Sequence, residues 1–207
     1  MQMATQSAAG FLLVGIGGGS ASGKSTLSSE LISLGQGDVV VLEIDRFYHC
    51  LGDRSDKHLA NFDEPAALDF ELIVSVLEQL KSDGTTLVPK YDFTTHTRTG
   101  FERFDATRVV IVEGILALHD ARLLRGFDQS IFVDAPASIR FKRREQRDIA
   151  ERGRDAESVK RQWDQTVQPM HSMYVESSKE IADLVIDGTS DLVVAARELL
   201  ARWKVQP

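Results

Sequence analysis

The sequence predicts a doubly wound α/β domain, in which helices cover both faces of a parallel sheet. Short aliphatic segments bounded by turn residues recur along the chain, as buried parallel strands do. Segments with helical spacing of apolar residues lie between them, so strand and helix alternate. The 207 residues, with 43% hydrophobic and 27% charged side chains, suit one globular domain.

The strand segments are short and aliphatic. They are Phe11 to Ile16, Val39 to Ile44, Val109 to Val112, Ile131 to Val133 and Leu184 to Ile186. Two helices are expected from apolar residues that recur on one face. One carries Leu72, Ile73, Val76, Leu77 and Leu80, and the other Leu192, Val193, Ala196, Leu199 and Leu200.

Two segments depart from this alternation. Residues 85–105 are rich in threonine and aromatic residues around Thr99-Gly100, which predicts a β-hairpin inserted into the α/β core. The long polar region from Ile139 to Ala182 is expected to be helical, with interruptions at Gly153 and Pro169. We expect residues 11–207 to form a single domain, preceded by a loose tail over residues 1–10.

The composition limits the classes of partner. A formal net charge of −7 and a pI near 5.3 argue against a general affinity for nucleic acid or for an anionic membrane. Any binding of phosphates must therefore be local. The single cysteine, Cys50, cannot form an internal disulfide, and the first ten residues lack the basic region of a signal peptide. These features predict a cytoplasmic protein.

A phosphate-binding motif follows the first predicted strand. The segment Gly18, Gly19, Ser20, Ala21, Ser22, Gly23, Lys24, Ser25 and Thr26 fits G-x-x-x-x-G-K-[ST] and precedes a helical pattern, the context that a P-loop requires. Its glycines let successive N–H groups face a phosphate of ATP, and the helix N-terminus adds a positive dipole end. Lys24 would neutralise the β- and γ-phosphates, and the Ser25 hydroxyl would ligate Mg²⁺. The guanine-reading motif N-K-x-D is absent, which disfavours a GTPase.

Asp45 is predicted to end the second strand, at the sheet edge where ligands bind in folds of this type. A carboxylate there could accept the proton of a substrate hydroxyl that attacks the γ-phosphate. Its position alone favours a simpler role, in which Asp45 caps a turn. Both interpretations stay open on these grounds.

Five segments, taken in order, resemble the uridine-cytidine kinases of the phosphoribulokinase and uridine kinase group. They are Asp45 to Tyr48 (DRFY), Asn61 to Pro65 (NFDEP), Tyr91 to Arg98 (YDFTTHTR), Val112 to Leu116 (VEGIL) and Arg147 to Arg154 (RDIAERGR). The resemblance extends from about Gly15 to Gly188. It implies a P-loop kinase fold with a helical lid over residues 139–155.

The resemblance assigns roles on the acceptor side. It implies that Asp45 is the base facing the 5′-hydroxyl of a pyrimidine nucleoside, that Asp63 holds the ribose hydroxyls, and that His96 reads the base. A carboxylate can accept two hydrogen bonds from a vicinal diol. The remaining nucleoside contacts implied by the resemblance are Tyr48, Phe62, Tyr91, Phe93, Arg147 and Gln162. Each aromatic residue, taken alone, could equally pack in a core.

On the donor side, the resemblance makes Glu113 a second Mg²⁺ contact. The segment from Arg140 to Arg154 contains seven basic residues and three acidic ones. Arginines four apart repel on one helix face, so an anion is expected nearby. The resemblance implies that Arg144, Arg152 and Arg154 hold the phosphate oxygens, the last two acting with Lys24 and Asp45 in catalysis.

The sequence therefore predicts an ATP- and Mg²⁺-dependent kinase that converts uridine or cytidine to UMP or CMP in pyrimidine salvage. The alternatives are another small-metabolite kinase of the same group, a non-catalytic ATP-binding module and a nucleic-acid-binding protein. The resemblance also implies a homotetramer that CTP and UTP inhibit. The adenine pocket, the choice between ATP and GTP and the choice between uridine and cytidine stay open.

Overall fold

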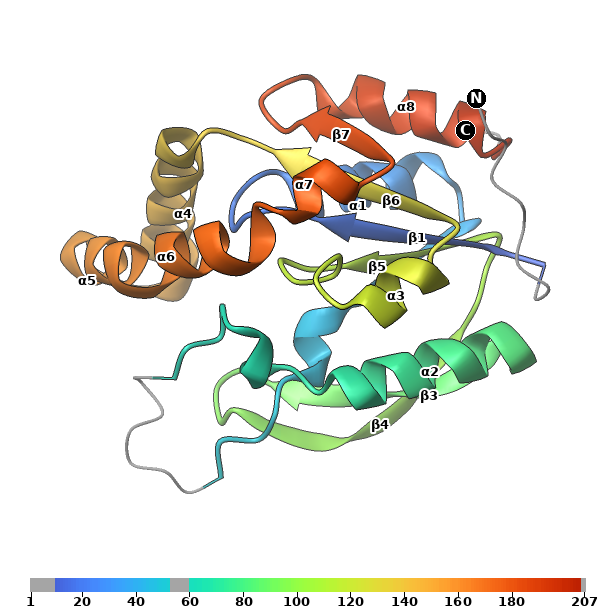
Figure 1. Ribbon diagram of the computed structural model, residues 1–207, viewed down its shortest axis with the longest axis horizontal. Coiled ribbons are helices and arrows are strands. Elements are labelled where there is room, and N and C mark those ends of the chain that lie inside the picture. Colours follow the sequence, from blue (N-terminus) through green and yellow to red (C-terminus); the bar gives the residue numbers. More distant parts are fainter. Residues whose placement is uncertain (1–9, 53–59, 206–207) are drawn as a thin grey trace.

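A computed structural model describes residues 10–52 and 60–205. Of the predicted N-terminal tail, only Gly10 falls within this part. A five-stranded parallel sheet forms the centre of the molecule, as predicted (Figure 1). In spatial order its strands are β2 (Val39–Glu43), β5 (Val109–Glu113), β1 (Leu12–Gly17), β6 (Gln129–Asp134) and β7 (Leu184–Asp187).

Helices cover both faces of this sheet, which completes the predicted doubly wound fold. On one face, α1 (Lys24–Leu34) and α8 (Leu192–Arg202) pack together against side chains such as Val14 and Ile111. On the other face, α2 (Phe70–Asp83) and α3 (Ala121–Gly126) pack against the alternate residues of the same strands, including Leu13 and Val110 (Figure 1). Alternation of side chains along each strand divides the core into these two layers.

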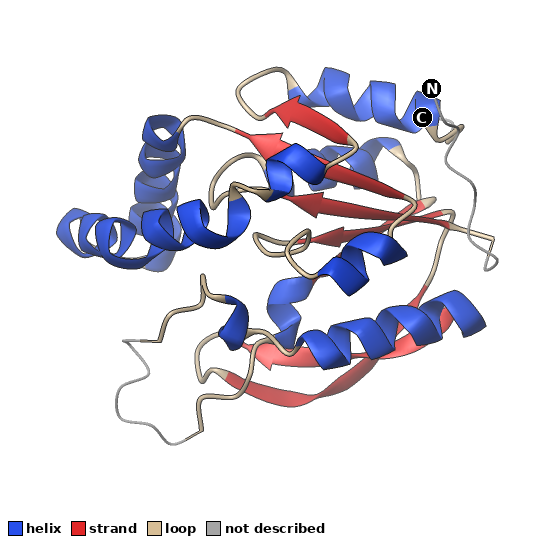
Figure 2. Ribbon diagram, viewed as in Figure 1, coloured by secondary structure: helices blue, strands red, loops and turns tan. Residues whose placement is uncertain are grey.

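The predicted hairpin is present as β3 (Thr85–Asp92) and β4 (Thr97–Asp105), which pair antiparallel in a separate two-stranded sheet (Figure 2). The helix α2 packs beside it. Arg98 ties the hairpin to the segment that follows β2 and to the start of α2. Its guanidinium donates to the carbonyls of Phe47 at 2.8 Å and Tyr48 at 3.1 Å and to Asp69 at 3.0 Å. The tip of the hairpin is thereby fixed beside the carboxyl edge of the main sheet.

A helical arm leaves the sheet after β6. It consists of α4 (Ala137–Arg152), a left-handed turn at Gly153 with φ 62°, and α5 (Ala156–Gln162). The chain then stays helical through α6 (Gln168–Met170). A π-helical turn lies on each side of α6, at Trp163–Val167 and at His171–Val175. The short α7 (Ser178–Ile181) leads to β7.

The predicted interruption at Gly153 is confirmed, but the one at Pro169 is wrong. Pro169 lies inside continuous right-handed helical backbone. Proline cannot donate the usual backbone hydrogen bond, and the π-helical turn directly before it changes the pairing there from i+4 to i+5. Within the described ranges, no helix is long and apolar enough to cross a membrane.

Candidate active site

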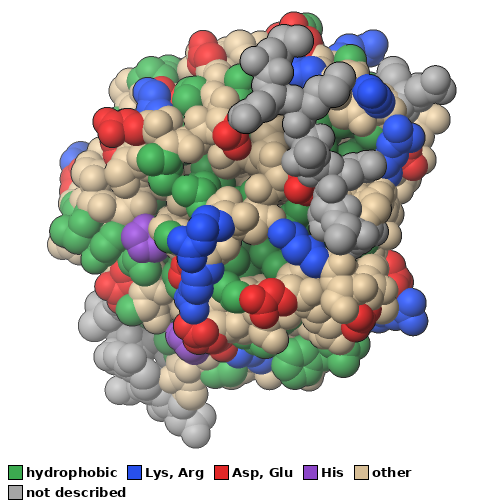
Figure 3. Space-filling view, turned by 45° about the vertical axis from the view of Figure 1, so that its right-hand side comes forward, with side chains coloured by type: hydrophobic (Ala, Val, Ile, Leu, Met, Phe, Trp, Pro, Cys, Tyr) green, Lys and Arg blue, Asp and Glu red, His purple; other side chains and the backbone are tan. Residues whose placement is uncertain are grey.

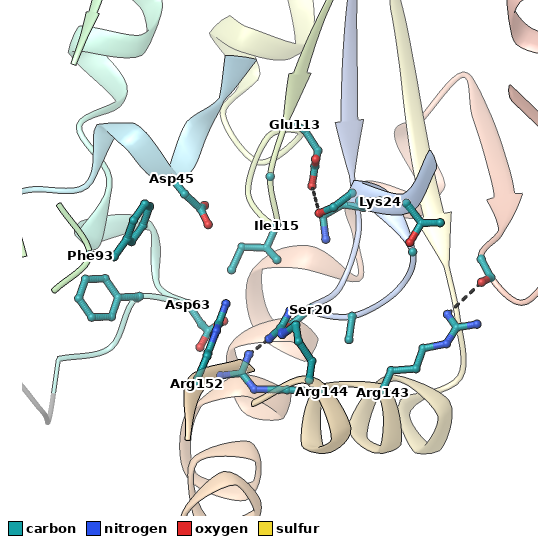
Figure 4. A pocket seen from close by; sticks show the side chains of 18 of the residues that line it. Ser20, Lys24, Asp45, Asp63, Phe93, Glu113, Ile115, Arg143, Arg144 and Arg152 are labelled. Atoms are coloured by element: carbon teal, nitrogen blue, oxygen red, sulfur yellow. Dashed lines mark hydrogen bonds between the residues drawn. The ribbon is translucent and has the colours of Figure 1, made fainter. Parts of the chain in front are cut away.

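A cavity of about 1330 Å³ lies at the carboxyl edge of the sheet. Its walls come from the P-loop, the 3₁₀ turn after β2, the hairpin tip, the helical arm and the segment between β7 and α8. Figure 4 shows Asp45, Lys24 and Glu113 on one side of this space, and Asp63, Arg144 and Arg152 on another. These six predicted donor and acceptor residues therefore share one cavity.

The P-loop forms the predicted cradle between β1 and α1. Gly18 has φ 139° and Gly23 has φ 114°, a region that favours glycine. A Cβ at Gly18 would lie 2.3 Å from the Val133 carbonyl oxygen, so this position requires glycine for space as well. Ser20, Ala21, Gly23, Lys24, Ser25 and Thr26 line the cavity, whereas Gly18, Gly19 and Ser22 lie behind them.

Lys24 is the first residue of α1, and its side chain is buried. Its Nζ donates a hydrogen bond to the Gly19 carbonyl, 2.9 Å away. Burial lowers the pKa of this ammonium, and the charges of Glu113 and Asp45 oppose that shift. The two carboxylates thus help to retain a positive charge beside the P-loop.

Ser25 and Glu113 meet at the end of β5, where the Ser25 hydroxyl donates to Glu113 Oε1 at 3.0 Å. Glu113 is buried, and this hydroxyl provides the partner that a buried carboxylate needs. Carboxylate and hydroxyl oxygens suit Mg²⁺, which proteins commonly hold with one or two side chains plus substrate phosphates. Ser25 and Glu113 offer one oxygen of each kind beside the P-loop. The described residues include no cluster of three or more His, Cys, Asp or Glu side chains arranged for a metal.

Asp45 does not end the second strand, as predicted, but lies two residues beyond that end. The strand β2 ends at Glu43, and Asp45 belongs to the 3₁₀ turn Ile44–Phe47 that follows it. The turn aims the carboxylate into the cavity, on the side that faces Lys24 (Figure 4). Burial raises the pKa of Asp45 to about 6, against the opposing charge of Lys24. A carboxylate with this pKa is suited to accept a proton near neutral pH.

Aromatic rings surround the acceptor end of the cavity. The Tyr48 and Phe62 rings meet edge to face with centroids 4.9 Å apart, and Phe62 stacks on His96 at 5.0 Å and 27°. Tyr48, Phe62, Phe93 and His96 line the cavity. Tyr91 lies behind this lining, where its ring contacts Tyr48 at 5.8 Å and Phe93 at 5.1 Å.

His96 and Asp63 supply polar groups among these rings. His96 adopts a left-handed conformation with φ 56°, and its Nδ1 is buried without a hydrogen-bond partner among the described residues. Asp63 lines the same cavity. Burial raises the pKa of Asp63, while the nearby Arg144 charge lowers it. Both side chains keep hydrogen-bonding capacity that a bound molecule could satisfy.

The predicted lid arginines converge on one buried residue that the sequence reasoning missed. The Asp148 carboxylate forms ion pairs with Arg144, Arg147, Arg152 and Arg154. Its position four residues from Arg144 and from Arg152 on one helix was the available signal. All four arginines line the cavity, as does Gln162, whose side-chain oxygen accepts hydrogen bonds from Arg144 and Arg154.

Arg143, for which the sequence pattern predicts no role, joins two walls of the cavity. Its guanidinium donates to the Gly188 carbonyl at 3.0 Å and to the Ser22 carbonyl at 3.3 Å. It therefore links α4 to the P-loop and to the segment that follows β7. Residues of that segment and of α8 also line the cavity: Gly188, Ser190, Asp191, Leu192 and Val193.

Comparisons with known proteins identify the family. The model of the Phosphoribulokinase / Uridine kinase family matches residues 13–195. Uridine kinase of Shewanella pealeana is 40% identical over 200 residues, which cover 92% of this chain and 94% of that protein. Mouse uridine-cytidine kinase-like 1 is 43% identical over 197 residues, again 92% of this chain. The chain spans only 36% of the length of that mouse protein.

The fold has solved counterparts as well. Phosphoribulokinase from Rhodobacter spheroides superposes with a TM-score of 0.60 at 15% identity, covering 90% of this chain and 75% of the other. At that identity the likeness concerns the fold alone. The assignment rests on the family-model match and on relatives that align over nearly their whole length. The chain belongs to the phosphoribulokinase/uridine kinase family.

Proposed function

We propose that this protein is a uridine-cytidine kinase, which transfers the γ-phosphoryl group of ATP to the 5′-hydroxyl of uridine or cytidine and so forms UMP or CMP. One observation carries the proposal. A single cavity joins the P-loop lysine, Lys24, to a carboxylate, Asp45, and to an aromatic pocket that contains His96. Relatives at about 40% identity that bear the name uridine kinase support it.

The acceptor pocket matches the chemistry of a pyrimidine ribonucleoside. Phe62 and Phe93 offer apolar ring faces to a planar base, and the unpartnered Nδ1 of His96 offers a hydrogen bond. Uracil presents an acceptor at its 4-position where cytosine presents a donor. A neutral imidazole can serve both, because either tautomer is accessible. The Asp63 carboxylate can accept hydrogen bonds from both ribose hydroxyls.

The side chains around the cavity can support an in-line transfer of the phosphoryl group by accepting a proton and by stabilising the negative charge of the phosphates. Asp45 accepts the proton of the 5′-hydroxyl as its oxygen attacks the γ-phosphorus, while the bond from that phosphorus to the β,γ-bridging oxygen breaks and ADP leaves. Lys24 and the arginines Arg144, Arg152 and Arg154 hold the phosphate oxygens on which charge develops. Ser25 and Glu113 would hold Mg²⁺, which supplies further neutralisation of the triphosphate when bound.

A steady-state screen of nucleosides with ATP·Mg²⁺ tests the proposal. We expect turnover of uridine and cytidine and little turnover of adenosine or guanosine. Loss of the 2′-hydroxyl leaves a buried acceptor unpaired, which costs about 1–3 kcal/mol, so kcat/KM for 2′-deoxyuridine should fall by roughly 5- to 150-fold. Comparable activity on adenosine, or activity on a sugar phosphate in place of nucleosides, would overturn the pyrimidine assignment.

Several finer properties stay predictions that rest on the family resemblance. They are the Mg²⁺ requirement, a cytoplasmic location, a role in pyrimidine salvage, a homotetramer, and inhibition by CTP or UTP. Size-exclusion chromatography with light scattering would check the oligomeric state. Titration of the end products into the nucleoside assay would check the inhibition.

A further inference from the structure

Asp148 is a buried carboxylate at the centre of the arginine cluster. Its side chain has no exposed area. Oδ1 lies 2.8 Å from Arg147 Nη2 and 3.3 Å from Arg152 Nη1, and Oδ2 lies 3.4 Å from Arg154 Nη1 and 3.6 Å from Arg144 Nε. Each carboxylate oxygen thus faces two guanidinium groups.

The main chain of Asp148 shapes the same region. Its carbonyl accepts the N–H groups of Gly153 and Arg154, the latter at 3.1 Å, where the chain turns through the left-handed Gly153. This turn reverses the chain after α4 and brings Arg154 back beside the carboxylate. Asp148 therefore fixes arginines that precede it on α4 and one that follows the end of the helix.

The charges in this cluster do not balance. Four guanidinium groups contact Asp148, and the described residues provide no other carboxylate in an ion pair with any of the four. Asp63, on the cavity wall, also acts on Arg144 through its charge, but two carboxylates among four guanidinium groups still leave an excess of positive charge there. Arg144 also donates to Ser20 Oγ of the P-loop at 2.7 Å, so this charge lies next to the phosphate cradle (Figure 4).

Asp148 itself does not reach the cavity. It is absent from the lining formed by the described residues, whereas Arg144, Arg147, Arg152 and Arg154 all contribute to that lining. Its carboxylate can therefore act on a bound molecule only through the arginines. A direct role in proton transfer or metal binding would require exposure that the side chain lacks.

We propose that Asp148 is a positioning residue, which holds the four arginines as a preassembled cluster for the phosphates of the nucleotide donor. The inference rests on the proposed kinase function and adds a residue outside the cavity to it. Without the carboxylate, the guanidinium groups repel one another and lose their fixed positions. Each phosphate contact must then be ordered when the nucleotide binds, which weakens binding.

The test uses Asp148→Asn, which keeps the shape and removes the charge. The matched control is Glu151→Gln, the same chemical change at an exposed position of α4. Isothermal titration with ATP·Mg²⁺ should give a Kd raised by roughly tenfold or more in Asp148→Asn, as expected when charged hydrogen bonds are lost. Glu151→Gln should bind ATP like the wild type.

A double-mutant cycle with Arg152→Ala separates positioning from general destabilisation. If Asp148 acts through the arginines, Arg152→Ala weakens ATP binding in the wild type but has little further effect in Asp148→Asn. Fully additive losses, or wild-type ATP affinity in folded Asp148→Asn, would overturn the proposal. Because binding is measured without a nucleoside, an error in the assigned acceptor leaves this test intact.

If Asp148→Asn does not fold, a second pair answers the same question. Arg147→Gln removes one charge, and Arg147→Gln with Asp148→Asn removes the carboxylate as well, with less repulsion left behind. The proposal expects weaker ATP binding in the double variant than in Arg147→Gln. Equal Kd values in these two proteins would refute it.

Discussion

Replacement of Asp45 with asparagine should make the protein less active and more stable at neutral pH. The pKa of Asp45 rises from its ordinary value of 3.8 to about 6 because the carboxylate is buried. The folded protein therefore favours the protonated form. The neutral carboxyl contributes stability below pH 4, and this contribution is lost as the pH rises through 6.

The size of the gain follows from this difference. A pKa difference of about two corresponds to about 3 kcal/mol. This free energy is the upper limit for the stability that Asp45→Asn gains at pH 8. The Asp45 carboxylate is largely surrounded by protein, but part of the residue borders a cavity that is open to water, so screening should reduce the gain to about 1–2 kcal/mol. At pH 4 or below, the two proteins should unfold with similar free energies.

Urea unfolding at pH 8 and pH 4, together with steady-state kinetics, measures both effects. Loss of the proton acceptor should lower kcat by about 10² to 10⁴, with a smaller change in nucleoside affinity. In the wild type, kcat/KM for uridine should fall as the pH drops below 6. Glu43→Gln, which removes an exposed charge two residues earlier, should change stability by no more than about 0.5 kcal/mol. An Asp45→Asn protein that is less stable at pH 8, or that keeps normal kcat, would refute the reasoning.

Three further substitutions test separate walls of the cavity. Lys24→Ala should abolish detectable turnover with the fold intact by circular dichroism, and a near-normal kcat at saturating ATP would contradict its role. His96→Ala should lower kcat/KM for uridine and cytidine by roughly tenfold or more, because one buried hydrogen bond is lost, and should change the KM for ATP little. Unchanged nucleoside kinetics would count against a role of His96 in base recognition. Gly188→Ala would place a Cβ 1.9 Å from the Ser22 carbonyl oxygen, so the P-loop must shift and the KM for ATP should rise by roughly tenfold. Gly126→Ala, whose Cβ would meet no described atom within 4 Å except Lys81 Nζ at 3.7 Å, serves as the control and should match the wild type.

The elements whose pattern is strongly periodic were predictable from the sequence. The aliphatic runs became the strands of the sheet, and the helix over Phe70–Asp83 buries Ile73, Val76, Leu77 and Leu80 as its spacing predicts. Pro169 shows where this reasoning fails. The helix continues through Pro169 because the neighbouring π-helical turns alter the hydrogen-bond pairing. The helix propensities of single residues do not predict such turns.

The candidate site was predictable where a motif specifies the backbone. The P-loop lies between β1 and α1, and Glu113 ends β5 beside Ser25. Arg143 was missed because its contacts depend on tertiary structure. Asp148 did have a signal in the sequence, its spacing to Arg144 and Arg152 on α4, but its burial and its contact with Arg154 depend on tertiary structure. Asp148 meets Arg154 only after the chain reverses at Gly153, and Arg143 reaches carbonyl groups far away in the sequence.

The distribution of charge explains how a chain with a net charge of −7 can offer a phosphate site. Acidic and basic side chains are interspersed over the face of the molecule in Figure 3, so no broad basic field covers that face. The arginines of the helical arm instead concentrate around one cavity, and the carboxylate that neutralises part of their charge is buried behind them. Beyond a Debye length of about 10 Å, salt screens the acidic remainder of the surface, whereas contacts within the cavity are screened much less. Triphosphate binding should therefore depend on the positions of these arginines far more than on the net charge of the chain.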